Sequence, residues 1–176
     1  MPSRRLIFLM VFIGNLSGSS AAFANENSNR ARAAVVAVDT FYVTPQGSNL
    51  TGTGAKDKPW RSLTFTLNQL SSDSLKPKVI KLANGVYSAA ATGESFPLNL
   101  KSWISLVGSD SVNTVINANK TARAMVGQNV VNILVIRLTI RNGFARADIG
   151  DASLGGGLYL RDCRRVAIKS CVLRLN

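Results

Sequence analysis

Residues 133–142 read ILVIRLTIRN, and residues 166–175 read VAIKSCVLRL. When position 133 is aligned with position 166, the apolar positions of the two stretches coincide, and Arg141 aligns with Arg174. An internal repeat of short β-branched runs is typical of a solenoid, in which each coil adds strands that pair in parallel with those of the next coil. A sandwich also accommodates short strands at this density, but it gives no reason for the match. The repeat therefore predicts an all-β, parallel solenoid.

Similar apolar runs occur elsewhere in the second half of the chain. They alternate with turns of Gly, Asn and Ser, and none of them carries a long helical stripe. The runs occupy residues 79–82, 104–107, 114–116, 133–140, 158–160 and 166–175. Ile80 and Ile104 have similar settings but lie closer together in sequence than the later aligned pair, so we expect the coil length to vary through insertions at turns.

The segment before these runs has a different pattern. Residues 41–43 (FYV) predict a short strand, and residues 44–58 predict a loop because they are rich in Gly and Thr. Pro59 suits the first position of a helix. A stripe at helical spacing follows, formed by Leu63, Leu67 and Leu70. We therefore predict an amphipathic helix that begins near Pro59 and ends near residues 71–74.

The start of the chain has the composition of an export signal. A positive n-region and the apolar run LIFLMVFI (residues 6–13) precede an A-x-A pattern that ends at Ala24. The apolar run is shorter than the ~20 residues that a transmembrane helix needs. We therefore predict a signal peptide over residues 1–24, cleaved after Ala24, and a flexible lead-in over residues 25–39. The protein is then secreted, periplasmic or at the cell surface, and has no transmembrane span.

The charge of the chain limits its chemistry and its partners. There are 21 Lys and Arg residues against 9 Asp and Glu, a formal net charge of +12, and no histidine. The absence of histidine excludes a Ser-His-Asp triad and a Cys-His dyad. The excess positive charge predicts an anionic partner. Because the protein is predicted to be exported, we expect a glycan and no nucleic acid.

Five motifs follow one another along residues 40–176. They are FYVTPQGS (41–48) with GTG (52–54) and KPWRSL (58–63), NGVY (84–87), ESFPL (94–98), SLVG (105–108), and GGGLY (155–159) with the repeated Cys163 and Cys171. In this order they resemble the motifs of right-handed parallel β-helix proteins of the pectin-lyase-like superfamily, and of the small DUF1565 group in particular. The resemblance implies that fold for nearly all of the chain beyond its signal.

The resemblance also implies how the chain is organised. In such folds an N-terminal helix covers the open end and protects a sheet edge that otherwise pairs with another chain, which gives residues 40–77 the role of a cap. Residues 78–176 then hold about four coils, at ~22–33 residues per coil. Members of the group usually continue for many more coils. We expect a C-terminally truncated product, a fragment, or a stub that oligomerises through its uncapped last coil.

Two alternatives remain open for Cys163 and Cys171. An exporting compartment permits a disulfide between them. They equally fit as small apolar core residues, since free cysteine is among the most buried residue types.

Lyases of this superfamily that cleave acidic polysaccharides use a Lys or Arg base together with Ca²⁺ held by carboxylates. The resemblance therefore implies Ca²⁺ if the chain is lyase-like, and no cofactor otherwise. The local acidic cluster is Asp148 and Asp151. A Ca²⁺ site takes about 6–8 oxygens, several of them from carboxylates, so these two aspartates are weak metal candidates. The alternative is that they form turns in a Gly-rich insertion. No catalytic residue is assigned.

Basic side chains give the better candidates for a binding site. If Arg141 and Arg174 share a register, they stack at the ~4.8 Å spacing of neighbouring strands, and Arg161 and Lys169 are close in sequence. These four residues form either a solvated face or a surface for acidic polysaccharide or envelope glycan. A second question is whether Trp103, Tyr87 and Tyr159 stack on sugar rings or pack in the core.

These observations favour an exported β-helix module that binds glycan or contributes to the cell envelope, without catalysis by this chain alone. The alternative is the N-terminal part of a carbohydrate-active enzyme, lyase-like or hydrolase-like, whose catalytic coils are missing.

Overall fold

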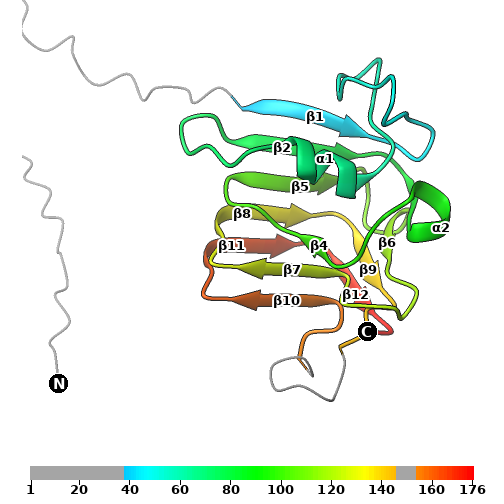
Figure 1. Cartoon of the computed structure of the whole chain (residues 1–176). Helices are drawn as coiled ribbons and strands as arrows, with labels where there is room; N and C mark the ends of the chain where they lie inside the picture. The colour runs from blue at the N-terminus through cyan, green and yellow to red at the C-terminus, as the bar shows by residue number, and fades with distance from the viewer. Residues whose placement is uncertain (1–37, 146–153) are drawn as a thin grey trace, which may run out of the picture. The chain divides into compact units, whose positions relative to one another are not determined.

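A computed structural model describes residues 38–145 and 154–176. Twelve strands and two short helices occur there, and the strands form three sheets whose pairings are all parallel (Figure 1). The elements are β1 (Asp39–Val43), α1 (Leu63–Gln69), β2 (Lys78–Leu82), β3 (Gly85–Tyr87), α2 (Ala89–Thr92), β4 (Leu98–Asn99), β5 (Ile104–Gly108), β6 (Thr114–Asn117), β7 (Met125–Gln128), β8 (Val131–Ile136), β9 (Thr139–Arg141), β10 (Leu158–Arg161), β11 (Arg164–Lys169) and β12 (Val172–Arg174).

The chain visits the three sheets in a fixed order. From β2 onward, one strand of the five-stranded sheet (β1-β2-β5-β8-β11) is followed by one of the four-stranded sheet (β12-β9-β6-β3) and then one of the three-stranded sheet (β10-β7-β4). The coils are β2-β3-β4, β5-β6-β7, β8-β9-β10 and the start of a fourth, β11-β12. The predicted parallel β-helix of about four coils is therefore confirmed.

The repeat found in the sequence is a structural register. Ile133 on β8 pairs with Val166 on β11, and Arg141 on β9 pairs with Arg174 on β12. The predicted single run 133–140 is in fact two strands, because Arg137 has a φ of 56° and turns the chain from one sheet into the next. Ser170, one coil later, has a φ of 51° and does the same. Each turn is a left-handed residue between two apolar stretches.

Further upstream the observed register differs from the expected one. Ile80 pairs with Leu106, and Ile104 pairs with Lys78. The expected match of Ile80 with Ile104 is therefore wrong by two residues, which is one period of side-chain alternation along a strand. An error of this size is invisible to the apolar pattern, because alternate side chains along a strand point to the same face.

The core lies inside the coils and is built from aligned columns. One column through the five-stranded sheet joins Ile80, Leu106, Val135 and Ile168. The first three are almost fully buried, whereas Ile168 is 39% exposed and Leu173, in the next sheet, is 49% exposed. Both belong to the last coil, which no described coil covers.

Helix α1 begins later than predicted. Ser62 is its N-cap, and the Ser62 side chain accepts a hydrogen bond from the Phe65 backbone N–H, so the helix starts at Leu63 and not at Pro59. Leu63, Leu67 and Leu70 are all buried, as the stripe predicted. The helix packs against β4 at the end of the three-stranded sheet. Its protective role at an open sheet edge remains a prediction.

A loop bonds the free edge of β1. The Tyr42 N–H donates to the Gly54 carbonyl (2.8 Å), and the Trp60 N–H donates back to the Tyr42 carbonyl (3.0 Å). The Trp60 ring stacks on Phe41 with a centroid distance of 5.5 Å. Gly54 has a φ of +78°, and a Cβ on it would lie only 2.8 Å from the Trp60 ring. The segment therefore fits against β1 because position 54 is glycine.

Glu94, from the ESFPL motif, is a buried carboxylate that holds the start of α1. Its Oε1 accepts from the Leu63 N–H (2.8 Å) and the Thr92 hydroxyl (3.0 Å). Its Oε2 accepts from the Thr64 N–H (2.7 Å) and the Thr64 hydroxyl (2.6 Å). A negative charge at the N-terminus of a helix is favourable, because the free N–H groups there carry partial positive charge.

Two sets of predictions fall outside the described residues. The signal peptide over residues 1–24, its cleavage after Ala24 and most of the lead-in lie there, as do Asp148 and Asp151. Within the described ranges, none of the helices has the length and apolarity required to cross a membrane.

Candidate functional site

The arginine strip, defined here as Arg141 and Arg174, lies on the four-stranded sheet. The two residues are register partners on β9 and β12, and Asn117 on β6 precedes them in the same column. Their inward neighbours Ile140 and Leu173 face the core column, so alternation directs the two arginines to the outer face of the sheet. The structure therefore brings this pair together as the register predicted.

The strip carries positive charge that the described part of the chain does not neutralise. No described carboxylate side chain lies within ion-pair distance of Arg141 or Arg174. The Arg141 Nε atom is buried and has no hydrogen-bond partner among the described residues, while Arg174 is exposed. Two like charges on neighbouring strands repel each other. An anion held between them relieves that repulsion.

The other two predicted residues lie elsewhere. Arg161 is at the end of β10 in the three-stranded sheet, and Lys169 is at the end of β11 in the five-stranded sheet. The four basic residues are thus distributed over all three sheets and do not share one sheet face. Sequence proximity placed them together, but successive strands of a coil belong to different sheets.

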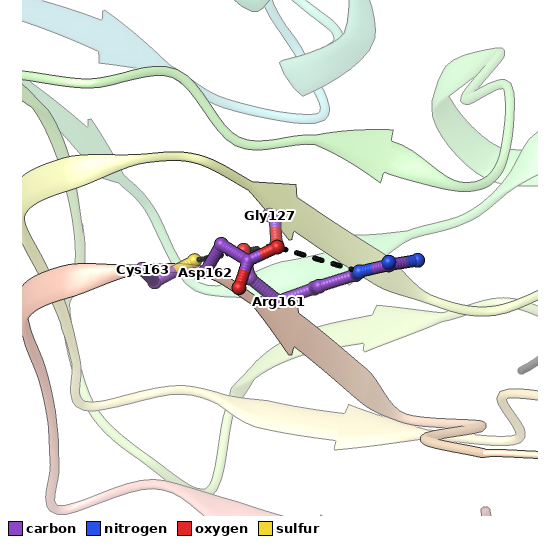
Figure 2. Close-up of polar contacts among 4 residues, drawn as sticks. All are labelled: Gly127, Arg161, Asp162 and Cys163. Atoms are coloured by element: carbon purple, nitrogen blue, oxygen red, sulfur yellow. Dashed lines mark hydrogen bonds and ion pairs between the residues drawn. The ribbon is translucent and has the colours of Figure 1, made fainter.

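Arg161 also has a local counter-charge. Its Nε lies 3.4 Å from the Asp162 Oδ2, and both side chains are more than half exposed (Figure 2). An exposed pair of this kind contributes only about 0–1 kcal/mol. It nevertheless lowers the positive charge that Arg161 offers to a polyanion, so the arginine strip is the better candidate.

The two cysteines occupy corners at opposite ends of β11. Both are free thiols, and the Cys163 Sγ lies 3.3 Å from the Gly127 carbonyl oxygen and 3.2 Å from the Arg161 carbonyl oxygen, either of which can accept its one proton (Figure 2). A six-residue strand spans ~20 Å, far beyond the ~4.4–6.8 Å between the Cα atoms of a disulfide. Of the two alternatives, the structure therefore supports partly buried packing residues, and both cysteines pack against the core.

Two of the three aromatic candidates for sugar stacking are packing residues. Tyr87 is fully buried, and its hydroxyl bonds the Val43 and Ala83 carbonyls. Burial, and then the nearby charge of Glu94, raise the pKa of Tyr87 far above its ordinary value. Tyr159 is buried beneath the Arg123 guanidinium, 4.4 Å from its ring centroid. Trp103 is half-buried in a turn, with a φ of 65°.

Tyr42 and Lys81 lie side by side on β1 and β2, a pairing that no pattern in the sequence indicated. The Lys81 ammonium is 5.7 Å from the centroid of the Tyr42 ring. Tyr42 was assigned only to a short strand, and Lys81 was one polar residue in another run. A loop and a helix separate the two strands in sequence. The strands share no sequence repeat, so their pairing could not be inferred from the sequence.

Calcium, implied if the protein were lyase-like, has no matching ligand set in residues 38–145 and 154–176. No three acidic or cysteine side chains gather there as metal ligands would.

The coil order, the parallel registers and the inward apolar columns define a parallel β-helix protein. Residues 45–134, just over half of the chain, match the family described as "Protein of unknown function (DUF1565)". The chain belongs to the DUF1565 family.

Two solved structures are similar to this chain. The pectin methylesterase PemA from Erwinia chrysanthemi is 17% identical, with a TM-score of 0.49 over 77% of this chain and 45% of that chain. A pectin methylesterase mutant in complex with hexasaccharide IV is 19% identical, with a TM-score of 0.50 over the same shares. This chain therefore spans less than half the length of either. The curated proteins include no match to the sequence.

Proposed function

We propose that the protein is an exported, non-catalytic β-helix module that binds acidic polysaccharide, such as an envelope glycan, through the arginine strip. The observation that carries the proposal is the register of Arg141 with Arg174. Among the described residues, neither arginine has a carboxylate side chain within ion-pair distance. Regularly spaced cations on a rigid sheet suit a polymer that repeats its negative charges. The export signal predicted over residues 1–24 supports an extracellular glycan as the partner.

The fold is consistent with such a ligand. A parallel β-helix presents side chains in straight columns along its length, which matches a linear polymer. The pectin methylesterase mutant is in complex with a hexasaccharide, so a protein of this architecture accommodates a sugar chain.

The proposal is tested by retention on immobilised polygalacturonate at low salt. Arg141→Ser/Arg174→Ser is expected to elute at lower salt than the wild type, because exposed charge interactions are screened by salt. The matched control, Lys58→Ser/Lys76→Ser, removes the same charge from exposed loop positions and should shift elution much less. Equal shifts for the two double variants would mean that net charge alone governs retention, and would overturn the proposal.

Two further measurements keep the test decisive. Arg141 is partly buried, so Arg174→Ser alone, at an exposed position, separates loss of binding from loss of folding. The competing hypothesis of an enzyme is addressed with pectate or alginate and added Ca²⁺. Cleavage of either polymer by the wild type would overturn the non-catalytic assignment.

A further inference from the structure

A second basic feature lies at the opposite end of the coils, in a cavity of about 360 Å³. The cavity lies at the ends of β1, β2 and β5. Its lining includes Thr44, Ala83 and Ser109, which directly follow those three strands. Parallel strands that share a register bring their carboxyl ends together. The cavity is therefore fixed by the fold itself, and the loop containing Lys56 and Pro59 forms its other wall.

The charged residues that line the cavity are all basic. Lys56 and Lys81 both line the cavity, and its lining contains no carboxylate. Both lysines are exposed, and neither forms an ion pair with a described residue. The Tyr42 ring and the Pro59 ring supply apolar surface between them. A ligand complementary to this lining carries a carboxylate on a ring that has an apolar face.

The Lys81 ammonium is already held near the Tyr42 ring, 5.7 Å from its centroid. This contact and the strand pairing of the two residues limit the positions that the ammonium can take. The Ser109 hydroxyl donates to the Leu82 carbonyl, which leaves its lone pairs free for a ligand hydroxyl. The lining thus offers two ring surfaces for a pyranose and two ammonium groups for a carboxylate.

We propose that this cavity, the Tyr42–Lys81 cavity, binds a single uronate unit of an acidic glycan. It lies on a different sheet from the arginine strip, so the proposal does not depend on the strip. The carboxylate specifies an acid, the ring surfaces specify a ring, and the volume suits one sugar better than a long chain. The cavity thus recognises the chemical identity of a unit, whereas the strip responds to the charge density of a polymer.

The test is a calorimetric or NMR titration of the whole protein with sodium galacturonate. The wild type is expected to bind galacturonate more tightly than its methyl ester, which has the same ring without the charge. Lys81→Gln and Lys56→Gln should each weaken binding by about tenfold, the size expected for one lost charge-assisted contact. The matched control is Lys58→Gln, a neighbouring exposed lysine that does not line this cavity, and it should leave affinity unchanged.

Each other outcome has a fixed meaning. Equal binding of galacturonate and its methyl ester, or unchanged binding by Lys56→Gln/Lys81→Gln, would overturn the proposal. Tighter binding of benzoate than of galacturonate would show that the cavity selects aromatic acids and not uronates, which would also overturn it. Arg141→Ser/Arg174→Ser should titrate like the wild type, so failure of this cavity and failure of the arginine strip are distinguishable. Both glutamine variants are at exposed positions, so their unfolding midpoints should match the wild type.

Discussion

Removing the charge of Glu94 should loosen the start of α1. Each carboxylate oxygen accepts one backbone N–H and one hydroxyl, from Leu63 and Thr92 on one side and from Thr64 on the other. Glu94→Gln replaces one of these acceptors with an NH₂ group. Whichever way the amide is turned, the NH₂ faces a backbone N–H, and that donor loses its partner.

The expected cost follows from these contacts. One buried donor left without a partner costs about 1–3 kcal/mol. Glu94→Ala removes both backbone contacts to a charged group and should cost about 3–6 kcal/mol. With a urea m-value of ~2 kcal/mol/M, Glu94→Gln lowers the unfolding midpoint by about 0.5–1.5 M. We therefore expect the order wild type, Gln, Ala in decreasing stability.

Urea unfolding followed by far-UV circular dichroism measures the midpoints. Asp57→Asn is the matched control, since Asp57 is an exposed carboxylate in the loop that precedes α1. The unfolding midpoint of this variant should equal that of the wild type. Amide hydrogen exchange provides the local measurement, because the Leu63 and Thr64 amides should exchange faster in Glu94→Gln. If the Gln variant unfolds at the wild-type midpoint with unchanged exchange at these amides, the carboxylate does not hold the helix and the reasoning fails.

Two further predictions concern the core. Burial raises the pKa of Tyr87 well above its ordinary value of 10.0. The unfolded chain therefore releases this proton near pH 10 while the folded chain keeps it, and the free energy of unfolding falls above that pH by up to about 1.4 kcal/mol per unit. The drop in urea midpoint between pH 9 and pH 11 should be smaller for Tyr87→Phe than for the wild type. Equal drops in the two proteins would contradict the assignment. The second prediction contrasts Val135→Asp with Arg137→Asp. Val135 is 1% exposed between Leu106 and Ile168, so a charge there should prevent folding or cost more than about 4 kcal/mol. Arg137 is an exposed turn residue and should tolerate the change to within about 1 kcal/mol, measured as soluble yield and melting temperature; similar losses at both positions would disprove the inward column.

The sequence predicted features that a period-two pattern or a repeat encodes. The register of Arg141 with Arg174 came from the repeat that aligns position 133 with position 166. The turn at Arg137 was missed because a left-handed arginine leaves no mark in an apolar run. β4 was missed because a strand as short as Leu98–Asn99 is too brief to form a pattern.

Of the candidate sites, too, only the one that the repeat encodes could be predicted from the sequence. The arginine strip was predictable because its members occupy equivalent places in consecutive coils. Arg161 and Lys169 lie on other sheets than the strip, which the sequence did not reveal because nearness along the chain does not tell which sheet a strand joins. Tyr42 and Lys81 meet across a long loop, and only the folded chain shows that they are neighbours. The role of Glu94 was hidden for a similar reason, because its partners at positions 63 and 64 lie 31 and 30 residues away.

The bonding of β1 by residues 54–60 has a consequence for how the protein folds. The contacts between Tyr42, Gly54 and Trp60 join positions at the two ends of a single loop, whereas every later strand must pair across a whole coil. Contacts between positions close in sequence form with the smallest loss of chain entropy. We expect this N-terminal segment to form early and to act as the template on which the following coils are added one at a time. Folding then has a direction along the solenoid, set at the end where the first strand is already closed.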